Sequence, residues 1–221
     1  MFGRSMGKNS LLLSLFALVT AGVLAATYQL TREQIAESER AAAEKALLEI
    51  IPEERHDNNL LADTRPVPAG ALGTLGLDAE AEVHLARLNG EIQAAIIPAV
   101  APDGYSGDIR LIVGVNRNGS IAGVRILTHN ETPGLGDKVE LKKSDWILGF
   151  NGKSLEQPQL EDWRVKKDGG TFDQFTGATI TPRAVVKQVR KVLLFVREHR
   201  DLLFSDTRSE ENSQNAEGET L

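Results

Sequence analysis

The segment from Asp173 to Pro182 gathers hydroxyl and small side chains in a pattern that could bind or carry a phosphate. It reads Asp173-Gln174-Phe175-Thr176-Gly177-Ala178-Thr179-Ile180-Thr181-Pro182. Thr181 followed by Pro182 is typical of a helix start, with the threonine as N-cap and the proline at the first helical position. The free amides and the dipole of a helix start attract phosphate. The small residues before it leave the Thr179 hydroxyl accessible, so the segment predicts phosphate binding or modification of that hydroxyl.

A second segment with chemical potential follows a predicted strand. It reads His129-Asn130-Glu131-Thr132-Pro133-Gly134-Leu135-Gly136-Asp137. Its glycines allow the backbone to approach a ligand closely or to adopt positive φ angles. A plain turn would need a single Pro-Gly pair, so the two glycines and the threonine exceed what a connection requires. Taken alone, however, the segment is more typical of an ordinary loop than of a ligand site.

Several familiar cofactor and catalytic signatures are absent from the sequence. The chain has no cysteine, which excludes disulfides, cysteine-ligated zinc, ordinary iron–sulfur clusters, CxxCH haem attachment and a thiol nucleophile. The Gly134-Leu135-Gly136 run lacks the third glycine of a dinucleotide fingerprint, and neither a P-loop nor an HExxH motif occurs. The four histidines have no metal-binding spacing. We therefore predict no metal site and no catalytic residue, and a redox role would need a cofactor held without sulfur.

The charge distribution argues against a nucleic-acid partner. The 221 residues include 25 Lys+Arg and 31 Asp+Glu, for a net charge of −6, whereas nucleic-acid binders usually carry a basic patch. Residues 206–221 hold five acidic residues against one arginine. This polar composition predicts a disordered acidic tail.

One long apolar run near the start predicts a membrane-spanning helix. The 23 residues between Lys8 and Arg32 carry no charge and are mostly Leu, Ala and Val, and about 20 such residues span the bilayer core. We expect the transmembrane helix at 10–30. The competing interpretation is a signal peptide cleaved after Ala25. Retention is favoured because the run exceeds a usual signal core and the helical pattern continues to Ile50.

Charges on either side of this run predict its orientation. Arg4 and Lys8 precede it, so the positive-inside rule keeps residues 1–9 in the cytoplasm. Residues 31–80 then form a helical stalk and an irregular connection, and the rest of the chain lies in the periplasm. The expected location is the bacterial inner membrane, with a single pass.

The remainder, 81–205, predicts an α+β domain. Two apolar pairs flank Asn89-Gly90 and Asn118-Gly119, which are hairpin turn signals, and they alternate like half-buried antiparallel strands. Residues 137–148 suggest a short helix or turn. From Pro182 to Leu203, valines recur on one face and basic residues on the others, which predicts a long amphipathic helix packed on the sheet.

The hydroxyl-rich segment also resembles the flavinylation motif Asp-x-x-Thr-Gly-Ala-Thr of bacterial FMN-binding domains. In that family a flavin transferase moves FMN from FAD onto the last threonine as a phosphoester, which implies FMN at Thr179. The family's Thr-Pro-Gly-Leu-Gly loop and Gly-Tyr-x-Gly turn are matched at 132–136 and 104–107. The cofactor-binding residues implied by the resemblance are Asp173, Thr176, Gly177, Ala178 and Thr179, with Thr132, Pro133, Gly134, Leu135 and Gly136 closing around the flavin phosphate or ribityl chain.

The resemblance also implies roles around these motifs. Asp173 and Thr176 would mainly be read by the transferase or shape the turn. His129 and Glu131 would either flank the flavin or have a surface role.

Together with the anchor and stalk, roughly residues 5–205 resemble the G-subunit family of Rnf/Rsx ion-translocating electron-transport complexes. That resemblance implies an electron-relaying flavoprotein subunit that is not catalytic alone and that works with other membrane and iron–sulfur subunits. It places the donor with ferredoxin or NADH and couples transfer to Na⁺ or H⁺ movement. Two alternatives remain: the C subunit of the sodium-translocating NADH:quinone reductase, and a non-redox anchored binding or scaffold module.

Overall fold

The computed structural model describes the backbone of residues 2–205, and the side chains of the same range except 2–9, 33, 35, 36, 38–40 and 42. The predicted acidic tail, 206–221, lies outside the described residues. The chain divides into two units, one ending at Ala43 and the other beginning at Glu44.

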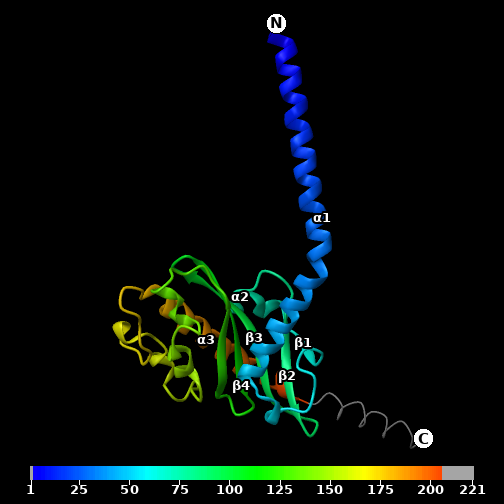
Figure 1. Ribbon diagram of the computed structural model, residues 1–221. Helices are drawn as coiled ribbons and strands as arrows, with labels where there is room; N and C mark the ends of the chain where they lie inside the picture. The colour runs from blue at the N-terminus through cyan, green and yellow to red at the C-terminus, as the bar shows by residue number, and fades with distance from the viewer. Residues whose placement is uncertain (1, 206–221) are drawn as a thin grey trace, which may run out of the picture. The chain divides into compact units, whose positions relative to one another are not determined.

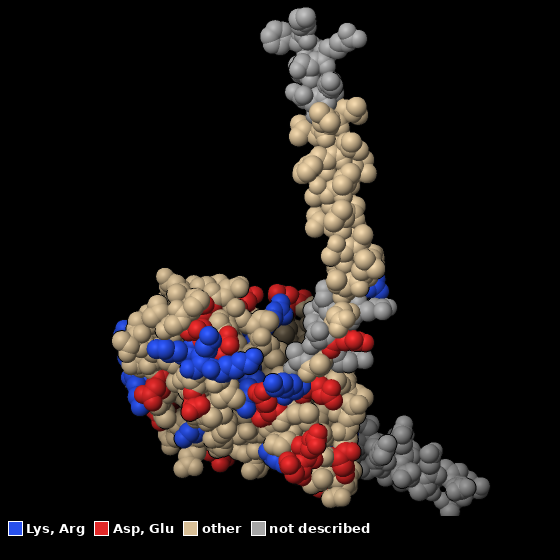
Figure 2. Space-filling view, in the orientation of Figure 1, with Lys and Arg blue, Asp and Glu red and all other residues tan. Residues whose placement is uncertain are grey.

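The first unit is the major part of helix α1 (Phe2–Ile50). Residues Ser10–Arg32 have a mean hydropathy of 2.1 and are long and apolar enough to cross a membrane. Their side chains are exposed, and Figure 2 shows most of this stretch as a surface without a charged side chain. An apolar column of this length is stable in lipid and not in water, so the predicted single membrane anchor is supported by the structure.

The second unit is built on a five-stranded antiparallel sheet (Figure 1). Its strands follow one another along the chain in the order β1-β2-β3-β4-β5. Their bounds are β1 Thr64–Pro66, β2 Glu82–Leu88, β3 Glu91–Gly104, β4 Gly107–Asn116 and β5 Ile121–Thr128. Asn89 and Gly90 join β2 to β3 with φ angles of 55° and 84°, as the two-residue hairpin turn demands. The predicted α+β class is therefore confirmed, and β1 is a strand that the sequence pattern did not indicate.

Both faces of the sheet are covered. Because side chains alternate along a strand, Val83 and Leu85 join the main core, whereas Ala86 joins a smaller one. Helix α3 (Ile180–Glu198) fills the main core, and the end of α1, with Leu47 and its neighbours, fills the smaller one. Figure 1 shows α3 and the last residues of α1, from Glu44 on, on opposite sides of the sheet.

Two glycines of the sheet allow the end of α1 to pack closely against it; we call this contact the seat of α1. Gly114 and Gly123 face each other across β4 and β5. A Cβ on Gly114 would overlap Cγ2 of Ile50, and one on Gly123 would lie 3.5 Å from the Ile50 Cα. The smallest residue is thus required at Gly114.

We expect Gly114→Ala to lower the free energy of unfolding by about 1–3 kcal/mol, the usual range for overpacking a tight contact. The β-branched side chain of Ile50 is stiff and cannot swing away cheaply. Urea unfolding measures the loss, with Gly149→Ala as control because the Cβ there meets open space. Equal stability of the two variants would show that Ile50 does not rest on this seat.

Between β5 and α3 the chain forms short 3₁₀ helices and turns, including η3 (Gly136–Val139) and η4 (Asp145–Phe150). This agrees with the predicted short helix or turn at 137–148.

The predicted start of the long helix is wrong: α3 begins at Ile180 with Thr179 as N-cap, two residues before the Thr181 cap that the sequence indicated. The helix also ends at Glu198, and α4 (Arg200–Phe204) follows as a separate turn.

Candidate functional site

The hydroxyl-rich motif forms the approach to α3 and remains open to solvent. Thr176 and Gly177 are exposed, whereas Ala178 and Thr179 are half-buried. Thr179 has φ −79° and ψ −27°, and its side chain makes no capping hydrogen bond. An N-cap threonine normally has extended backbone and accepts a bond from its own helix. Within the described residues the Thr179 hydroxyl has no hydrogen-bond partner, so it is an unpaired hydroxyl at a helix start.

The first backbone amides of α3 are equally free. The earliest bond of the helix runs from the Arg183 amide to the Thr179 carbonyl at 3.3 Å. The amides of Ile180 and Thr181 have no protein acceptor among the described residues, and Pro182 has no N–H to offer. Unsatisfied donors and the positive end of the helix dipole favour an anion beside Thr179. This geometry fits a phosphate group attached to that residue.

Aromatic side chains contact the hydroxyl-rich motif at Asp173 and Phe175. The Trp146 indole N–H donates to the Asp173 carbonyl at 2.8 Å, and its ring meets Phe175 at 5.1 Å between centroids. Gly177 turns the chain with φ 83°, and the Ala178 amide donates to the Phe175 carbonyl at 3.2 Å. Trp146 therefore fixes the backbone of the motif, a role that the sequence did not indicate.

Two ion pairs lie at the surface of the same region. Lys166 and Asp173 approach to 2.6 Å, with both side chains more than half exposed. Arg183 donates twice to Asp168, at 2.6 and 2.8 Å. The hydrogen bond from Arg183 lowers the pKa of the Asp168 carboxyl, and the same bond raises the pKa of Arg183. Exposed ion pairs contribute little to the free energy of unfolding. These contacts therefore affect the orientation of the surface side chains more than the stability of the segment.

The glycine loop, residues 132–136, lies against the hydroxyl-rich motif. Residues 132–135 are exposed, and Gly136 is buried. The amides of Leu135 and Gly136 both donate to the Thr132 carbonyl at 3.1 Å, which closes the loop. A Cβ on Gly177 would lie 3.6 Å from Cδ2 of Leu135. The structure thus brings together the two segments that the sequence singled out.

A buried carboxylate lies under both segments. The side chain of Glu131 accepts hydrogen bonds from the Ser106 amide at 2.8 Å and from the Thr181 hydroxyl. Glu131 is 4% exposed and Thr181 1%, which rules out the surface role, one of the two considered for Glu131. Its place next to the glycine loop was visible in the sequence. Its two partners, 25 and 50 residues away, were not.

His129 also points inward, with 8% of its side chain exposed, which rules out the surface role considered for it. Its Nδ1 accepts the Glu131 amide at 2.9 Å, and its Nε2 contacts Glu140 at 2.6 Å. An accepting Nδ1 places the ring proton on Nε2, which then donates to the carboxylate. The histidine therefore supports the loop. Among the described residues no group of three or more His, Asp or Glu side chains could hold a metal.

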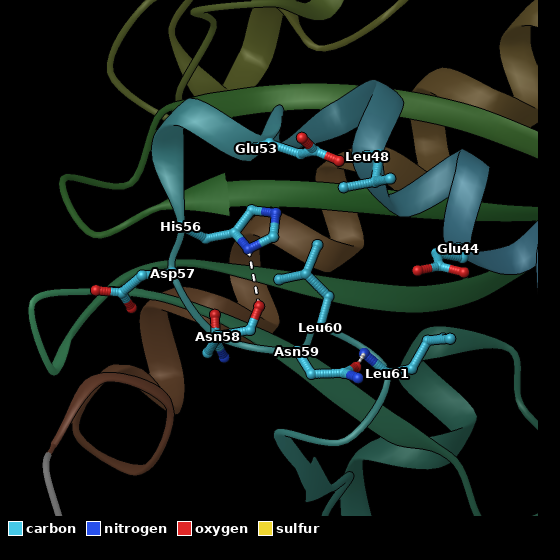
Figure 3. Close-up of a pocket in the computed structure, with 9 residues that line it drawn as sticks. All are labelled: Glu44, Leu48, Glu53, His56, Asp57, Asn58, Asn59, Leu60 and Leu61. Carbon is cyan, nitrogen blue, oxygen red and sulfur yellow. Dashed lines mark hydrogen bonds between the residues drawn. The ribbon is translucent and has the colours of Figure 1, made fainter.

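The motifs lie outside two hollows of this unit. One cavity of about 360 Å³ is bordered by the end of α1 and the segment after it (Figure 3). Its nine lining residues run from Glu44 to Leu61 and include His56, whose Nδ1 contacts the Asn58 carbonyl at 2.9 Å. The other, of about 120 Å³, lies beside the end of α3. No motif residue lines either hollow, and the motifs form an exposed shelf.

Comparison with known proteins gives two matching family models. Residues 104–194 match the FMN-binding domain, and residues 1–50 match the RnfG N-terminal region. The first range contains the Gly104–Gly107 turn, the glycine loop and the hydroxyl-rich motif.

Curated relatives are similar over almost the whole chain. The G subunit of the ion-translocating oxidoreductase complex of Pseudomonas aeruginosa is 53% identical over 202 residues, which cover 91% of this chain and 94% of that protein. The corresponding protein of Vibrio cholerae is 48% identical, covering 89% and 92%. A crystal structure of Shewanella oneidensis NqrC has a TM-score of 0.45 and 22% identity, over 64% of this chain and 67% of that one.

Three findings agree with one another. The relatives are identical to this extent over nine-tenths of both chains, an FMN-binding domain is matched, and one apolar helix fits a single-pass anchor. The chain belongs to the G-subunit family of ion-translocating oxidoreductase complexes, and it is an FMN flavoprotein subunit that takes part in electron transport.

Proposed function

We propose that Thr179 carries FMN as a phosphoester and that the domain relays electrons through this attached flavin. The observation that carries the proposal is the contrast between neighbouring hydroxyls. Thr181 is buried and bonded to Glu131, whereas Thr179 has a free hydroxyl at the start of a helix whose first amides are unpaired. Among these two threonines only Thr179 can accept a bulky phosphoryl group without breaking an existing contact.

The attachment balances as a phosphoryl transfer from FAD. The Thr179 oxygen forms a new bond to the phosphorus of the FMN half, the pyrophosphate bond of FAD breaks, and AMP leaves. The hydroxyl proton passes to a base of the transferase. The product is a phosphodiester with one negative charge, which the free amides of Ile180 and Thr181 can accept.

An exposed shelf explains why a covalent bond is useful. Binding sites that retain a ligand without such a bond usually enclose most of its surface, but residues 132–135 and Thr176–Gly177 are exposed. When bound, FMN supplies the ability to take up and release one or two electrons. The chain contributes the attachment point and the exposed apolar side chains of Leu135 and Ile180, which are 42% and 43% exposed, as a surface for a flat ring.

The other motif residues have supporting roles in this proposal. Asp173 and Thr176 are available for recognition by a flavin transferase, since Thr176 is exposed and the Asp173 side chain is 68% exposed. Gly177 and Ala178 are small and leave the approach to Thr179 open. Thr132, Pro133, Gly134, Leu135 and Gly136 form the wall of the shelf next to the phosphate.

The proposed organisation follows from the anchor. Residues 1–9 lie in the cytoplasm, 10–30 cross the bacterial inner membrane, 31–80 form the stalk and connection, and 81–205 form the periplasmic FMN domain, with 206–221 as an acidic tail. The proposed partners are the other membrane and iron–sulfur subunits of the complex, and a flavin transferase for maturation. Any iron–sulfur cluster of the assembly would lie in those other subunits, because a chain without cysteine supplies no thiolate ligands. This protein acts as a carrier within the translocase.

Denaturing gel electrophoresis tests the covalent link directly. The full chain is produced with and without a flavin transferase, denatured and viewed under ultraviolet light. We expect a fluorescent band at the position of the chain only when the transferase is present, since non-covalent FMN is lost on denaturation. A dark band in both samples would refute the proposed attachment.

A further inference from the structure

Glu131 lies where three separate segments of the domain meet. One carboxylate oxygen accepts the Ser106 amide of the turn between β3 and β4, and the other accepts the Thr181 hydroxyl in the first turn of α3. The residue itself lies directly before the glycine loop. Turn, loop and helix start are thus joined through one side chain across 25 and 50 residues of sequence.

The backbone around this carboxylate is too close to admit any side chain. A Cβ on Gly136 would lie 2.8 Å from the Thr181 hydroxyl oxygen and 2.9 Å from the nearer Glu131 oxygen. A Cβ on Gly104 would lie 3.0 Å from the other Glu131 oxygen and would overlap the Gly107 carbonyl. The two glycines allow the loop and the turn to close onto Glu131, each next to a different carboxylate oxygen.

The contact with Thr181 lies where two starts of α3 compete. Thr181-Pro182 is by itself a strong start signal, because threonine caps a helix through its hydroxyl and proline suits the first position. In the structure that hydroxyl is bound to Glu131, and the helix begins at Ile180 instead. A buried carboxylate that accepts two hydrogen bonds near a helix N-terminus is stabilised by both the donors and the dipole. Glu131 therefore overrides the local preference.

We propose that Glu131 is the positioning residue of the flavin-attachment site. By holding the Thr181 hydroxyl it keeps Thr179 next to the first helical residue, with a free oxygen and with the glycine loop beside it. Without the carboxylate, the Thr181 side chain is free to rotate until its oxygen accepts a backbone amide and caps the helix, and Thr179 moves out of its place at the helix start. This inference rests on the attachment of FMN to Thr179.

Three variants test the role, and the quantity measured is the initial rate of flavin incorporation by purified transferase with FAD. Each rate is divided by the fraction of the variant that is folded, which near-ultraviolet circular dichroism measures. Glu131→Ala loses both hydrogen bonds, and we expect its rate to fall at least about tenfold, because small misplacements of a reacting group carry large rate penalties. Glu131→Gln keeps an acceptor for Ser106 and a donor for the Thr181 oxygen. Its rate should stay within about threefold of the wild-type rate, because both contacts remain and the attachment site is not misplaced.

The third, a double variant compared with Thr181→Val alone, separates positioning from general damage. Valine cannot cap a helix, so in a Thr181→Val background the further change Glu131→Ala should cost much less than it does alone. Such non-additivity is the signature of two residues that act through one contact. Ile96→Ala is the matched control, since Ile96 is fully buried in the smaller core under α1. It should lower stability and leave the rate per folded molecule unchanged.

Two results would overturn the positioning role while the wild type and Thr181→Val still take up flavin. One is a Glu131→Ala rate equal to wild type per folded molecule, and the other is a Glu131→Gln rate as low as that of Glu131→Ala. If Glu131→Ala does not fold, Glu131→Gln decides: a rate per folded molecule at least about tenfold below that of the wild type would overturn the role, because glutamine keeps both contacts. Absence of flavin from the wild type itself would refute the attachment to Thr179, and the positioning role with it.

Discussion

Thr179→Val is expected to remove covalent flavin completely while leaving the fold intact. Valine has nearly the shape of threonine and lacks only the oxygen that would bond to phosphorus. The lost hydroxyl makes no hydrogen bond within the described residues, so no partner is left unsatisfied and stability should change by less than about 0.5 kcal/mol. In-gel flavin fluorescence and the mass of the intact chain measure the loss, and thermal unfolding measures the stability.

Two neighbouring substitutions sharpen this result. Thr179→Ser keeps a hydroxyl at the same place and should retain fluorescence. Thr176→Val removes an exposed hydroxyl that we assign to recognition, so the band should weaken but persist. A fluorescent Thr179→Val together with a dark Thr176→Val would move the attachment to Thr176.

The second large effect concerns membrane topology. Because the chain has no cysteine, a single introduced thiol can be labelled without background. Ser5→Cys lies before the apolar span, and Ser205→Cys lies at an exposed position at the end of the globular unit. With a membrane-impermeant maleimide on intact spheroplasts, we expect Ser205→Cys to be labelled fully and Ser5→Cys only after the membrane is permeabilised.

The paired serines control for each other, and both leave Arg4 and Lys8 in place for the positive-inside signal. A reversed labelling pattern would contradict the proposed orientation. A soluble product that begins after Ala25 or Ala26 would instead show that the span is a cleaved signal sequence, which the same labelling experiment detects as loss of Ser205→Cys from the membrane fraction.

The elements that could be predicted are those controlled by neighbours in sequence. Asn89-Gly90 gives a hairpin turn because both residues tolerate positive φ. The valines of α3 recur on one face, and Val185, Val189 and Val192 are fully buried. Strand β1 was missed because it is only three residues long and includes Pro66, so its pairing with β2 carries too little local pattern to detect.

The site shows the same division more sharply. The order of motifs around Thr132 and Thr179 was readable because each has a distinctive composition. The role of Trp146 was not, because it holds Asp173 across 27 residues through a single hydrogen bond. His129 and Glu131 were assigned equally to the surface or the flavin, since sequence offers no measure of how strongly a charged side chain is desolvated.

Composition and local pattern are enough to establish that one apolar segment can span a membrane, that no sulfur ligand is available, and that a threonine hydroxyl lies among small residues before a helix. These properties depend on composition and on contacts within a few residues. The residue at which that helix begins depends instead on a contact between distant parts of the chain. Thr181-Pro182 is locally the better start, but a buried carboxylate from Glu131 binds the threonine hydroxyl, and an unpaired carboxylate in the interior would cost more free energy than a lost cap. The helix therefore starts at Ile180, and Thr179 keeps its free oxygen.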